Sequence, residues 1–272
     1  MVMAIFNRKP ATDPIPGAIA LVTGAGNGIG RATATRLAAA GASVIAADVD
    51  GDAAARTASE IGGKAHTLDV RDRGAWAELA AAINEEHGSL GILVNNAGVG
   101  LSARMLDSSD EDWDWVLDIN LVGMINGCAA FGPAMVEAKK GHIVNISSGL
   151  GYVPRADQIA YVTSKAGMIE FTRSLRADWI RYGLTVSVIC PGLINSGIDK
   201  RVRYKGELAT DESRQSVYDL FAKGRPPEKV GDAILDAIRR NRAVVPVGWD
   251  AAVPWHLRSF MPPALVDRIG GI

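Results

Sequence analysis

Short apolar runs alternate with helical patterns along most of this chain. Seven runs are dominated by small and branched apolar residues, and most are followed by glycine or a polar residue. They cover residues 18–23, 43–47, 65–68, 92–95, 142–146, 185–189 and 243–247. The stretches between most of them have the spacing of amphipathic helices. This alternation predicts seven buried strands in a parallel sheet with helices on both faces, that is, a doubly wound α/β fold.

The same pattern divides the chain into three segments. Residues 1–17 contain three prolines and are expected to form a flexible lead-in. Residues 18–250 hold the strands and helices, and a chain of 272 residues suits one large domain better than two small ones. Residues 251–272 form an apolar and basic tail. Within the domain, the charged residues 197–225 are interpreted as a mobile lid over the substrate, with a solvated surface helix as the alternative.

The helix after Tyr161 carries two apolar stripes. One consists of Met168, Phe171, Leu175 and Trp179, and the other of Val162, Ala166 and Ile169. A helix that packs on one face of a sheet needs only one apolar stripe. We therefore expect a homodimer or homotetramer in which one stripe contacts another subunit, with deep burial inside a single chain as the alternative.

From Pro246 onward the chain is unusually rich in large apolar side chains. They are Trp249, Trp255, Leu257, Phe260, Met261, Leu265, Val266 and Ile269. Such a surface promotes aggregation if it stays exposed, so something must cover it. We expect packing within the chain or against another subunit. Weak contact with a membrane surface is the alternative, because aromatic and arginine residues suit that environment.

Composition excludes several classes of function. The chain is 48% hydrophobic and 22% charged with a formal net charge of -1, which disfavours disorder and nucleic-acid binding. Cys128 and Cys190 lie in apolar runs and are expected to be reduced core residues. The four histidines are scattered, so no metal site is predicted. Neither a spanning apolar run nor a signal peptide is apparent, and we expect a cytoplasmic protein.

Tyr161 and Lys165 form a candidate acid/base pair. Residues four apart lie on one face of a helix, so the lysine ammonium can sit beneath the tyrosine ring and favour its phenolate form. Free tyrosine has a pKa of about 10, and bringing it near neutrality takes roughly 4 kcal/mol of stabilisation by positive charge. One lysine plus a bound nicotinamide cation would supply it.

A glycine-rich turn follows the first predicted strand. Gly24, Gly26, Gly28 and Gly30 let backbone N–H groups approach a pyrophosphate at the start of a helix. Their spacing differs from the usual dinucleotide fingerprint, so alone they also fit a tight connection. Asp48 ends the second strand, where a carboxylate accepts from ribose hydroxyls and repels a 2′-phosphate. This favours NAD over NADP, with a solvated turn carboxylate as the alternative.

Further motifs occur in order along the chain. Thr23–Gly30 reads Thr-Gly-x-x-x-Gly-x-Gly, Asp69-Val70 follows the third strand, Asn95–Gly98 reads Asn-Asn-Ala-Gly, and Pro191-Gly192 follows the sixth strand. Over roughly residues 17–250 the chain resembles the short-chain dehydrogenase/reductase family. The resemblance implies a single Rossmann-type domain and a nicotinamide-dependent oxidoreductase that acts on CH–OH groups.

The resemblance also implies roles for individual residues. The catalytic set is Asn120, Ser148, Tyr161 and Lys165. Ser148 would hold the substrate oxygen near Tyr161, which exchanges a proton with it. Lys165 would also hold the nicotinamide ribose, and a helix kink at Asn120 would hold a water that links the lysine to solvent. The implied cofactor-binding residues are Gly24, Asn27, Gly28, Ile29, Gly30, Asp48, Asp69, Val70, Asn96, Ala97, Gly98, Tyr161, Lys165, Pro191, Gly192, Ile194 and Ser196. Ser196 stands where the family often has threonine and retains the hydroxyl.

The substrate is defined only by class. Leu101, Leu150, Val153 and Leu193 fall where the family's loops meet the substrate, which favours a hydrophobic secondary alcohol or ketone. Oxidation of the alcohol with NAD is the expected direction. One alternative is an NADPH-dependent carbonyl reductase, although no arginine beside Asp48 would compensate a phosphate. Another is a non-catalytic nucleotide-sensing protein of the same fold, against which the full catalytic set argues.

Overall fold

The fold is built on a seven-stranded sheet in which every neighbouring pair is parallel. The computed structural model describes residues 12–258, 260–262, 264 and 268. The strand order is β3-β2-β1-β4-β6-β7-β9. The strands are β1 (Ile19–Thr23), β2 (Ser43–Asp48), β3 (Lys64–Thr67), β4 (Ile92–Asn95), β6 (His142–Ile146), β7 (Thr185–Pro191) and β9 (Val244–Val247). All seven predicted runs form strands, and the doubly wound α/β prediction is confirmed.

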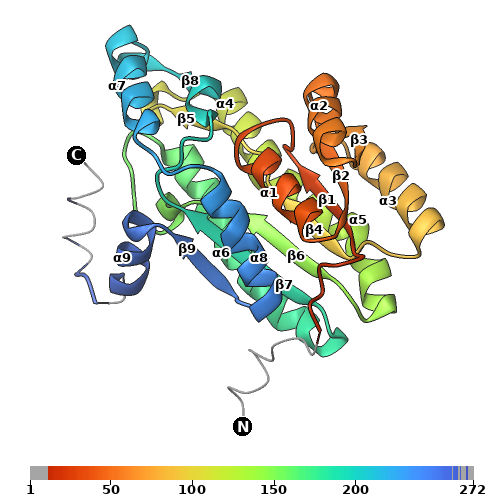
Figure 1. The fold of residues 1–272 in the computed structure, drawn as a ribbon. Helices are drawn as coiled ribbons and strands as arrows, with labels where there is room; N and C mark the ends of the chain where they lie inside the picture. The colour runs from red at the N-terminus through yellow and green to blue at the C-terminus, as the bar shows by residue number, and fades with distance from the viewer. Residues whose placement is uncertain (1–11, 259, 263, 265–267, 269–272) are drawn as a thin grey trace.

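Helices cover both faces of this sheet (Figure 1). They are α1 (Gly28–Ala39), α2 (Gly51–Ile61), α3 (Arg73–His87), α4 (Asp110–Leu117), α5 (Gly123–Ala138), α6 (Ile159–Trp179), α7 (Asp211–Ala222), α8 (Glu228–Arg240) and α9 (Trp249–Leu257). Alternate residues of one strand enter different cores: Val22 packs with α1 and α8, whereas Leu21 packs with α3, α5 and α6. Burial on both sides explains why the central strands are mostly apolar, whereas the edge strand β3 is exposed and polar.

The strand order reverses between β1 and β4. From β1 the chain builds outward to β2 and β3, and then returns to add β4 on the other side of β1. Helices leave the two neighbouring strands in opposite directions at such a point, so a crevice opens beyond their carboxyl ends. The glycine-rich turn follows β1 and the Asn-Asn-Ala-Gly motif follows β4, which places both motifs at this crevice.

The long helical run Asp110–Ala138 is interrupted by a π-helical turn. This turn, Asp118–Val122, separates α4 from α5 and contains the fully buried Asn120. Single π turns inside α-helices are frequent at functional sites, and the kink that the family resemblance implied is of this kind. By length and composition alone the run would cross a membrane, but half of its most apolar stretch is buried inside the protein. It therefore has the character of a core helix.

A second, two-stranded sheet was not predicted from the sequence. β5 (Gly100–Ser102) pairs in parallel with β8 (Val202–Tyr204). Beside this pair, the Arg203 guanidinium lies 3.7 Å from the ring centroid of Trp115. The first part of the predicted lid is thus attached to the main domain, whereas α7 further along it contains no buried residue. Movement of this segment stays a prediction.

The predicted lead-in over residues 1–17 is wrong for its last residues. Ile15 is fully buried, and the Gly17 N–H donates to the Gly41 carbonyl at 2.8 Å. Asp13 forms an ion pair with Arg239 of α8 at 2.8 Å. Proline content suggested a loose segment, but the single apolar residue between Pro14 and Pro16 anchors it in the core.

The apolar stripes of α6 are largely used within the chain. Met168 and Ile169 are buried, and Phe171, Leu175 and Trp179 contact the core while staying partly exposed. The Trp179 ring lies against Gly132 of α5, where any side chain would collide with it. Burial in one chain therefore accounts for much of the pattern, and a homo-oligomer stays a prediction.

The tail residues divide between contact and exposure. Ala251 is fully buried, and the Trp255 ring meets Tyr152 edge to face at 5.3 Å. Trp249, Leu257 and Phe260 are exposed. Leu265, Val266 and Ile269 lie outside the described residues.

Candidate active site

The four predicted catalytic residues converge at the carboxyl ends of β4 and β6. Ser148 follows β6 and caps the short helix η4 (Gly149–Tyr152), with its Oγ accepting from the Leu150 N–H at 3.1 Å. Tyr161 and Lys165 lie on successive turns of α6, and the lysine Nζ is 5.7 Å from the tyrosine ring centroid. The sequence-based placement of lysine beneath tyrosine is therefore reproduced by the structure.

Asn120 and Lys165 meet around Gly98. A β-carbon at Gly98 would lie 3.3 Å from the Asn120 Oδ1 and 3.4 Å from the Lys165 Nζ. The Asn120 Oδ1 accepts from the Val99 N–H at 2.8 Å, and its Nδ2 donates to the Val99 carbonyl and to the Ser164 Oγ. Its side chain thus braces the loop after β4 against α6, which fixes the helix turn that carries Lys165.

Burial dominates the titration of both members of the acid/base pair. It raises the pKa of Tyr161, while a side-chain hydrogen bond with Ser148 lowers it. It also lowers the pKa of Lys165 from 10.5 to about 8, against a smaller opposing effect of Cys190. In the protein alone the net shift of the Tyr161 pKa is thus upward, whereas the sequence-based argument expected a downward shift. The remaining contribution in that argument was the positive charge of a bound nicotinamide.

The glycine-rich turn has the form of a phosphate cradle. Gly24 and Gly28 have φ angles of 63° and 52°, which non-glycine residues rarely adopt. A side chain at Gly30 would collide with the Gly24 carbonyl. The Asn27 side chain makes no capping bond to α1, and the first turn of that helix holds no acidic residue. Its N-terminal N–H groups and dipole are thus available to an anion, which fits a dinucleotide pyrophosphate.

Asp48 faces this turn from the end of β2. The side chain is buried, with its Oδ2 accepting from the Gly26 N–H at 2.9 Å and its Oδ1 from the Asp50 N–H at 3.1 Å. The alternative of a solvated turn carboxylate is therefore wrong. A buried acceptor that is fixed beside the phosphate cradle suits the adenosine ribose of a dinucleotide.

The Asn-Asn-Ala-Gly motif connects the cradle to the catalytic helix. The Thr23 Oγ1 accepts from the N–H groups of Asn96 and Ala97 at 2.9 and 3.1 Å. The Asn96 Nδ2 donates to the carbonyl oxygens of Thr23 and Gly24. Gly98 then approaches the catalytic residues, as described above. One short segment thus sets the distance between the two halves of the site.

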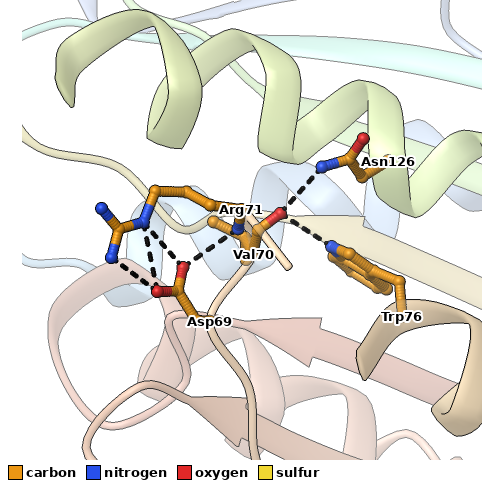
Figure 2. Close-up of polar contacts among 5 residues, drawn as sticks. All are labelled: Asp69, Val70, Arg71, Trp76 and Asn126. Atoms are coloured by element: carbon orange, nitrogen blue, oxygen red, sulfur yellow. Dashed lines mark hydrogen bonds and ion pairs between the residues drawn. The ribbon is translucent and has the colours of Figure 1, made fainter. Parts of the chain in front are cut away.

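Asp69 and Val70, the residues expected near adenine, are held by a local network (Figure 2). Arg71 donates to both carboxylate oxygens of Asp69, with the shortest contact at 2.6 Å. This pairing holds the pKa of Asp69 below its ordinary value. The Val70 carbonyl accepts from the Trp76 Nε1 at 2.9 Å and the Asn126 Nδ2 at 3.1 Å. Arg71 was not among the residues predicted from the sequence, although its place two residues after Asp69 was a possible signal.

The loop after β7 brings the remaining predicted cofactor residues to the cradle. Ile194 is buried, and the Ser196 carbonyl lies against Gly28, where a β-carbon would overlap it. Beside this contact is a hollow of about 590 Å³. Asn27, Gly28 and Ser196 line it, whereas none of the four catalytic residues does. The hollow therefore borders the phosphate end of the predicted site.

Two further observations limit the chemistry of the site. Leu101 is buried in a small cluster with Ala103, Val116 and Ala160, so its expected contact with substrate is wrong. Leu150, Val153 and Leu193 are partly exposed. Among the residues that the structure describes, no group of three or more His, Cys, Asp or Glu side chains is placed to hold a metal ion.

Comparison with known proteins identifies the family. Residues 18–206 match the short chain dehydrogenase family. The chain is 40% identical over 255 residues to the probable oxidoreductase EphD of Mycobacterium tuberculosis, a match that covers 90% of this chain but only 43% of that relative. It is 32% identical over 228 residues to the 3-oxoacyl-[acyl-carrier-protein] reductase FabG of Thermotoga maritima, with 81% and 90% coverage.

A solved structure supports the same assignment. A short chain dehydrogenase/reductase from Burkholderia phymatum, determined in complex with NAD, superposes with a TM-score of 0.81. It is 28% identical in sequence, and the superposition covers 92% of this chain and 95% of that one. Together with the nucleotide cradle and the tyrosine and lysine pair, these matches show that the chain belongs to the short-chain dehydrogenase/reductase family of nicotinamide-dependent oxidoreductases.

Proposed function

We propose that this protein is an NAD-dependent oxidoreductase that interconverts a secondary alcohol and a ketone, with Tyr161 as general acid/base. The observation that carries the proposal is the grouping of Ser148, Tyr161 and Lys165 at the end of the crevice that also holds the phosphate cradle. A site that only bound nucleotide would have no use for a tyrosine hydroxyl held beside Ser148 and above a buried lysine.

The residues divide the reaction between them. A nicotinamide held beside Lys165 and the loop after β7 would supply the hydride acceptor for oxidation of the alcohol and the hydride donor for reduction of the ketone. Tyr161 accepts the hydroxyl proton of the alcohol during oxidation and donates it back during reduction. Ser148 holds the same oxygen by a hydrogen bond, which orients the carbon for transfer. Lys165 stabilises the tyrosine oxygen when it carries negative charge.

Asp48 supports NAD as the preferred cofactor. Its carboxylate is already desolvated and fixed by two backbone N–H groups, so it cannot turn away from a 2′-phosphate without losing them. The next residues, Val49 and Asp50, supply no positive charge that would offset the repulsion. The alternative NADPH-dependent carbonyl reductase is for this reason less well supported.

The substrate proposed is a hydrophobic secondary alcohol or its ketone. Leu150 and Val153 follow Ser148, and Leu193 follows the Pro191-Gly192 motif, so partly exposed apolar side chains flank the reacting position from two loops. The partly buried Tyr152 and Trp255 extend this apolar boundary.

A panel of secondary alcohols of increasing chain length tests the proposal, with NAD or NADP as oxidant and absorbance of the reduced cofactor as readout. We expect turnover with NAD that improves with apolar chain length. Faster turnover with NADP would contradict the cofactor assignment. Tight binding of NAD without hydride transfer to or from any member of the panel would support the nucleotide-sensing alternative.

A further inference from the structure

An ion pair outside the predicted site holds the loop that follows β7. Asp250, in the first turn of α9, accepts from the Leu193 N–H with its Oδ2 at 2.5 Å and from the Arg225 Nη1 with its Oδ1 at 2.6 Å. Both side chains are largely withdrawn from solvent, at 26% and 29% exposure, so water screens this pair less than a surface ion pair.

Backbone hydrogen bonds attach the same loop on both sides. The Gly192 N–H donates to the Val247 carbonyl at 2.9 Å. The Arg225 N–H donates to the Leu193 carbonyl at 3.0 Å, and the Asn195 N–H donates to the Arg225 carbonyl at 2.9 Å. Among the described residues the Leu193 N–H has no hydrogen-bond acceptor other than the Asp250 carboxylate. Asp250 therefore completes the hydrogen bonding of this loop.

Two glycines make room for the ion pair. A β-carbon at Gly192 would overlap the Asp250 carboxylate. Gly248 has a φ of 98°, and a β-carbon there would lie 2.5 Å from both the Arg225 Nη1 and the Asp250 Oδ1. The carboxylate also lies at the positive end of α9, which stabilises its charge. The backbone at Gly192 and Gly248 and the first turn of α9 thus all favour the ion pair between Asp250 and Arg225.

We propose that Asp250 and Arg225 are positioning residues that fix the loop Gly192–Ser196 against the cofactor, and that α9 in this way controls how long the reduced cofactor stays bound. The inference rests on the proposed function in that this loop carries the predicted nicotinamide contacts Ile194 and Ser196. Neither side chain touches the reacting atoms. Their effect is transmitted through the Leu193 N–H and the backbone on either side of it.

Hydrogen exchange of the loop amides tests the positioning role without any assay of turnover. In Asp250→Ala the Leu193 amide loses its charged acceptor, and we expect its exchange to become at least about 10-fold faster, the size of one charge-assisted hydrogen bond. Asp250→Asn retains an oxygen that accepts from Leu193 and should recover part of the protection. Arg225→Met removes the charge but retains an aliphatic stem, and gives a second disruption if Asp250→Ala fails to fold.

Stopped-flow fluorescence of bound NADH tests the consequence for the cofactor. We expect NADH to dissociate about 3- to 10-fold faster from Asp250→Ala and Arg225→Met than from the unaltered protein. Asp236→Ala is the matched control, because it removes the ion pairs of another partly exposed aspartate with Arg240 and Arg242, and these ion pairs do not involve the loop. It should change neither measurement.

The outcomes separate this inference from the proposed function. Unchanged exchange at Leu193 in Asp250→Ala overturns the positioning role, and faster exchange with unchanged NADH dissociation overturns control of the cofactor. Either result leaves the alcohol dehydrogenase proposal standing. Absence of turnover by the unaltered protein on every alcohol would instead refute that proposal, while exchange and NADH dissociation would still decide the role of Asp250.

Discussion

Tyr161 lies where two opposing influences on its hydroxyl meet. Removal from water disfavours the phenolate, whereas the Ser148 hydrogen bond favours it. Burial lowers the pKa of Lys165 to about 8, so the lysine ammonium loses its positive charge as the pH rises past that value. In the proposed mechanism the charge of an oxidised cofactor would therefore help to activate the tyrosine, so that activation would follow nucleotide binding.

Tyr161→Phe should reduce turnover by at least about 10²-fold while NAD binding stays nearly unchanged, because only the proton-transfer hydroxyl is removed. Steady-state kinetics and a separate NAD titration measure the two quantities. Tyr182→Phe, which alters a surface tyrosine, is the control and should retain full activity. Near-normal turnover in Tyr161→Phe would refute the mechanism.

Asp48→Asn should weaken NAD binding and reduce the preference for NAD over NADP by about 10-fold or more, because a negative charge beside the 2′ position is lost. Dissociation constants for both nucleotides give the ratio. Asp52→Asn changes an exposed carboxylate of the same region and should leave the ratio unchanged. A wild-type protein that binds NADP more tightly would contradict the assignment.

His142 is expected to make folding stability sensitive to acid. Burial lowers its pKa from 6.5 to about 3, and its ring contacts the Thr185 and Ser187 hydroxyls. Between these values the unfolded chain binds a proton that the folded protein excludes. Its contribution to stability is thus complete above pH 6.5 and is lost as pH falls toward 3, by up to about 1.4 kcal/mol per pH unit.

Urea unfolding between pH 4 and about pH 7 measures this dependence. The slope of stability against pH should be smaller in His142→Gln than in the unaltered protein, and His256→Gln, which changes an exposed histidine, should leave it unchanged. Equal slopes in all three proteins would show that His142 does not titrate as described.

The sequence predicted those site residues that occur in spaced motifs. Tyr161 and Lys165 are spaced by one helical turn, and Asp48 comes directly after an apolar run. For these residues the side-chain type and the place in the sequence together indicated the role. Arg225 and Asp250 could not be found in this way. They lie 25 residues apart in different elements, and their pairing is set by how α9 packs beside β9.

At the level of elements, the pattern of apolar residues predicted a strand correctly where the strand is buried along its whole length. The central strands β1, β2, β4, β6 and β7 are buried along almost their whole length, so their apolar runs stand out, whereas β3 at the sheet edge is mostly exposed. β5 and β8 have three residues each, with β5 buried throughout and β8 only partly buried, and such segments are too short for any period to be recognised. The π turn was equally hidden, because Asp118–Val122 continues the apolar pattern of its flanking helices.

The attachment of β8 gives a test of the lid hypothesis. Arg203→Ala removes the cation–π contact with Trp115, and we expect the Michaelis constant for the alcohol to rise about 2- to 5-fold with little change for NAD. Arg201→Ala, which removes an exposed arginine just before β8, should change neither constant. If the two constants rise together in Arg203→Ala, the segment does not act on substrate alone.

At the level of the whole molecule, α9 leaves an apolar surface open. Trp249, Val253 and Leu257 recur every four residues at 74%, 49% and 47% exposure, and Phe260 follows at 83%. Spacing of this kind forms one stripe along a helix. We expect a second copy of the chain to cover it, in line with the predicted homo-oligomer.

Val253→Ser combined with Leu257→Ser should shift the protein to a smaller species in sedimentation velocity, because apolar area at the contact is lost. Both side chains are exposed, so the hydrogen bonds of Asp250 and with them the cofactor loop should be retained. Unchanged sedimentation with loss of binding to liposomes would favour the membrane alternative. Unchanged results in both experiments would show that this stripe is not an interface.

The return of the chain from β3 to β4 also has a consequence during synthesis on the ribosome. β1 can pair with β2 soon after both emerge, but its other edge waits for β4. About 70 residues separate the end of β1 from the start of β4, which at a translation rate of ~5–20 residues per second is roughly 4 to 14 s. Throughout that interval the nascent chain has an unpaired edge on a mostly apolar strand. Chaperone binding should therefore be strongest on chains arrested before Ile92 leaves the exit tunnel.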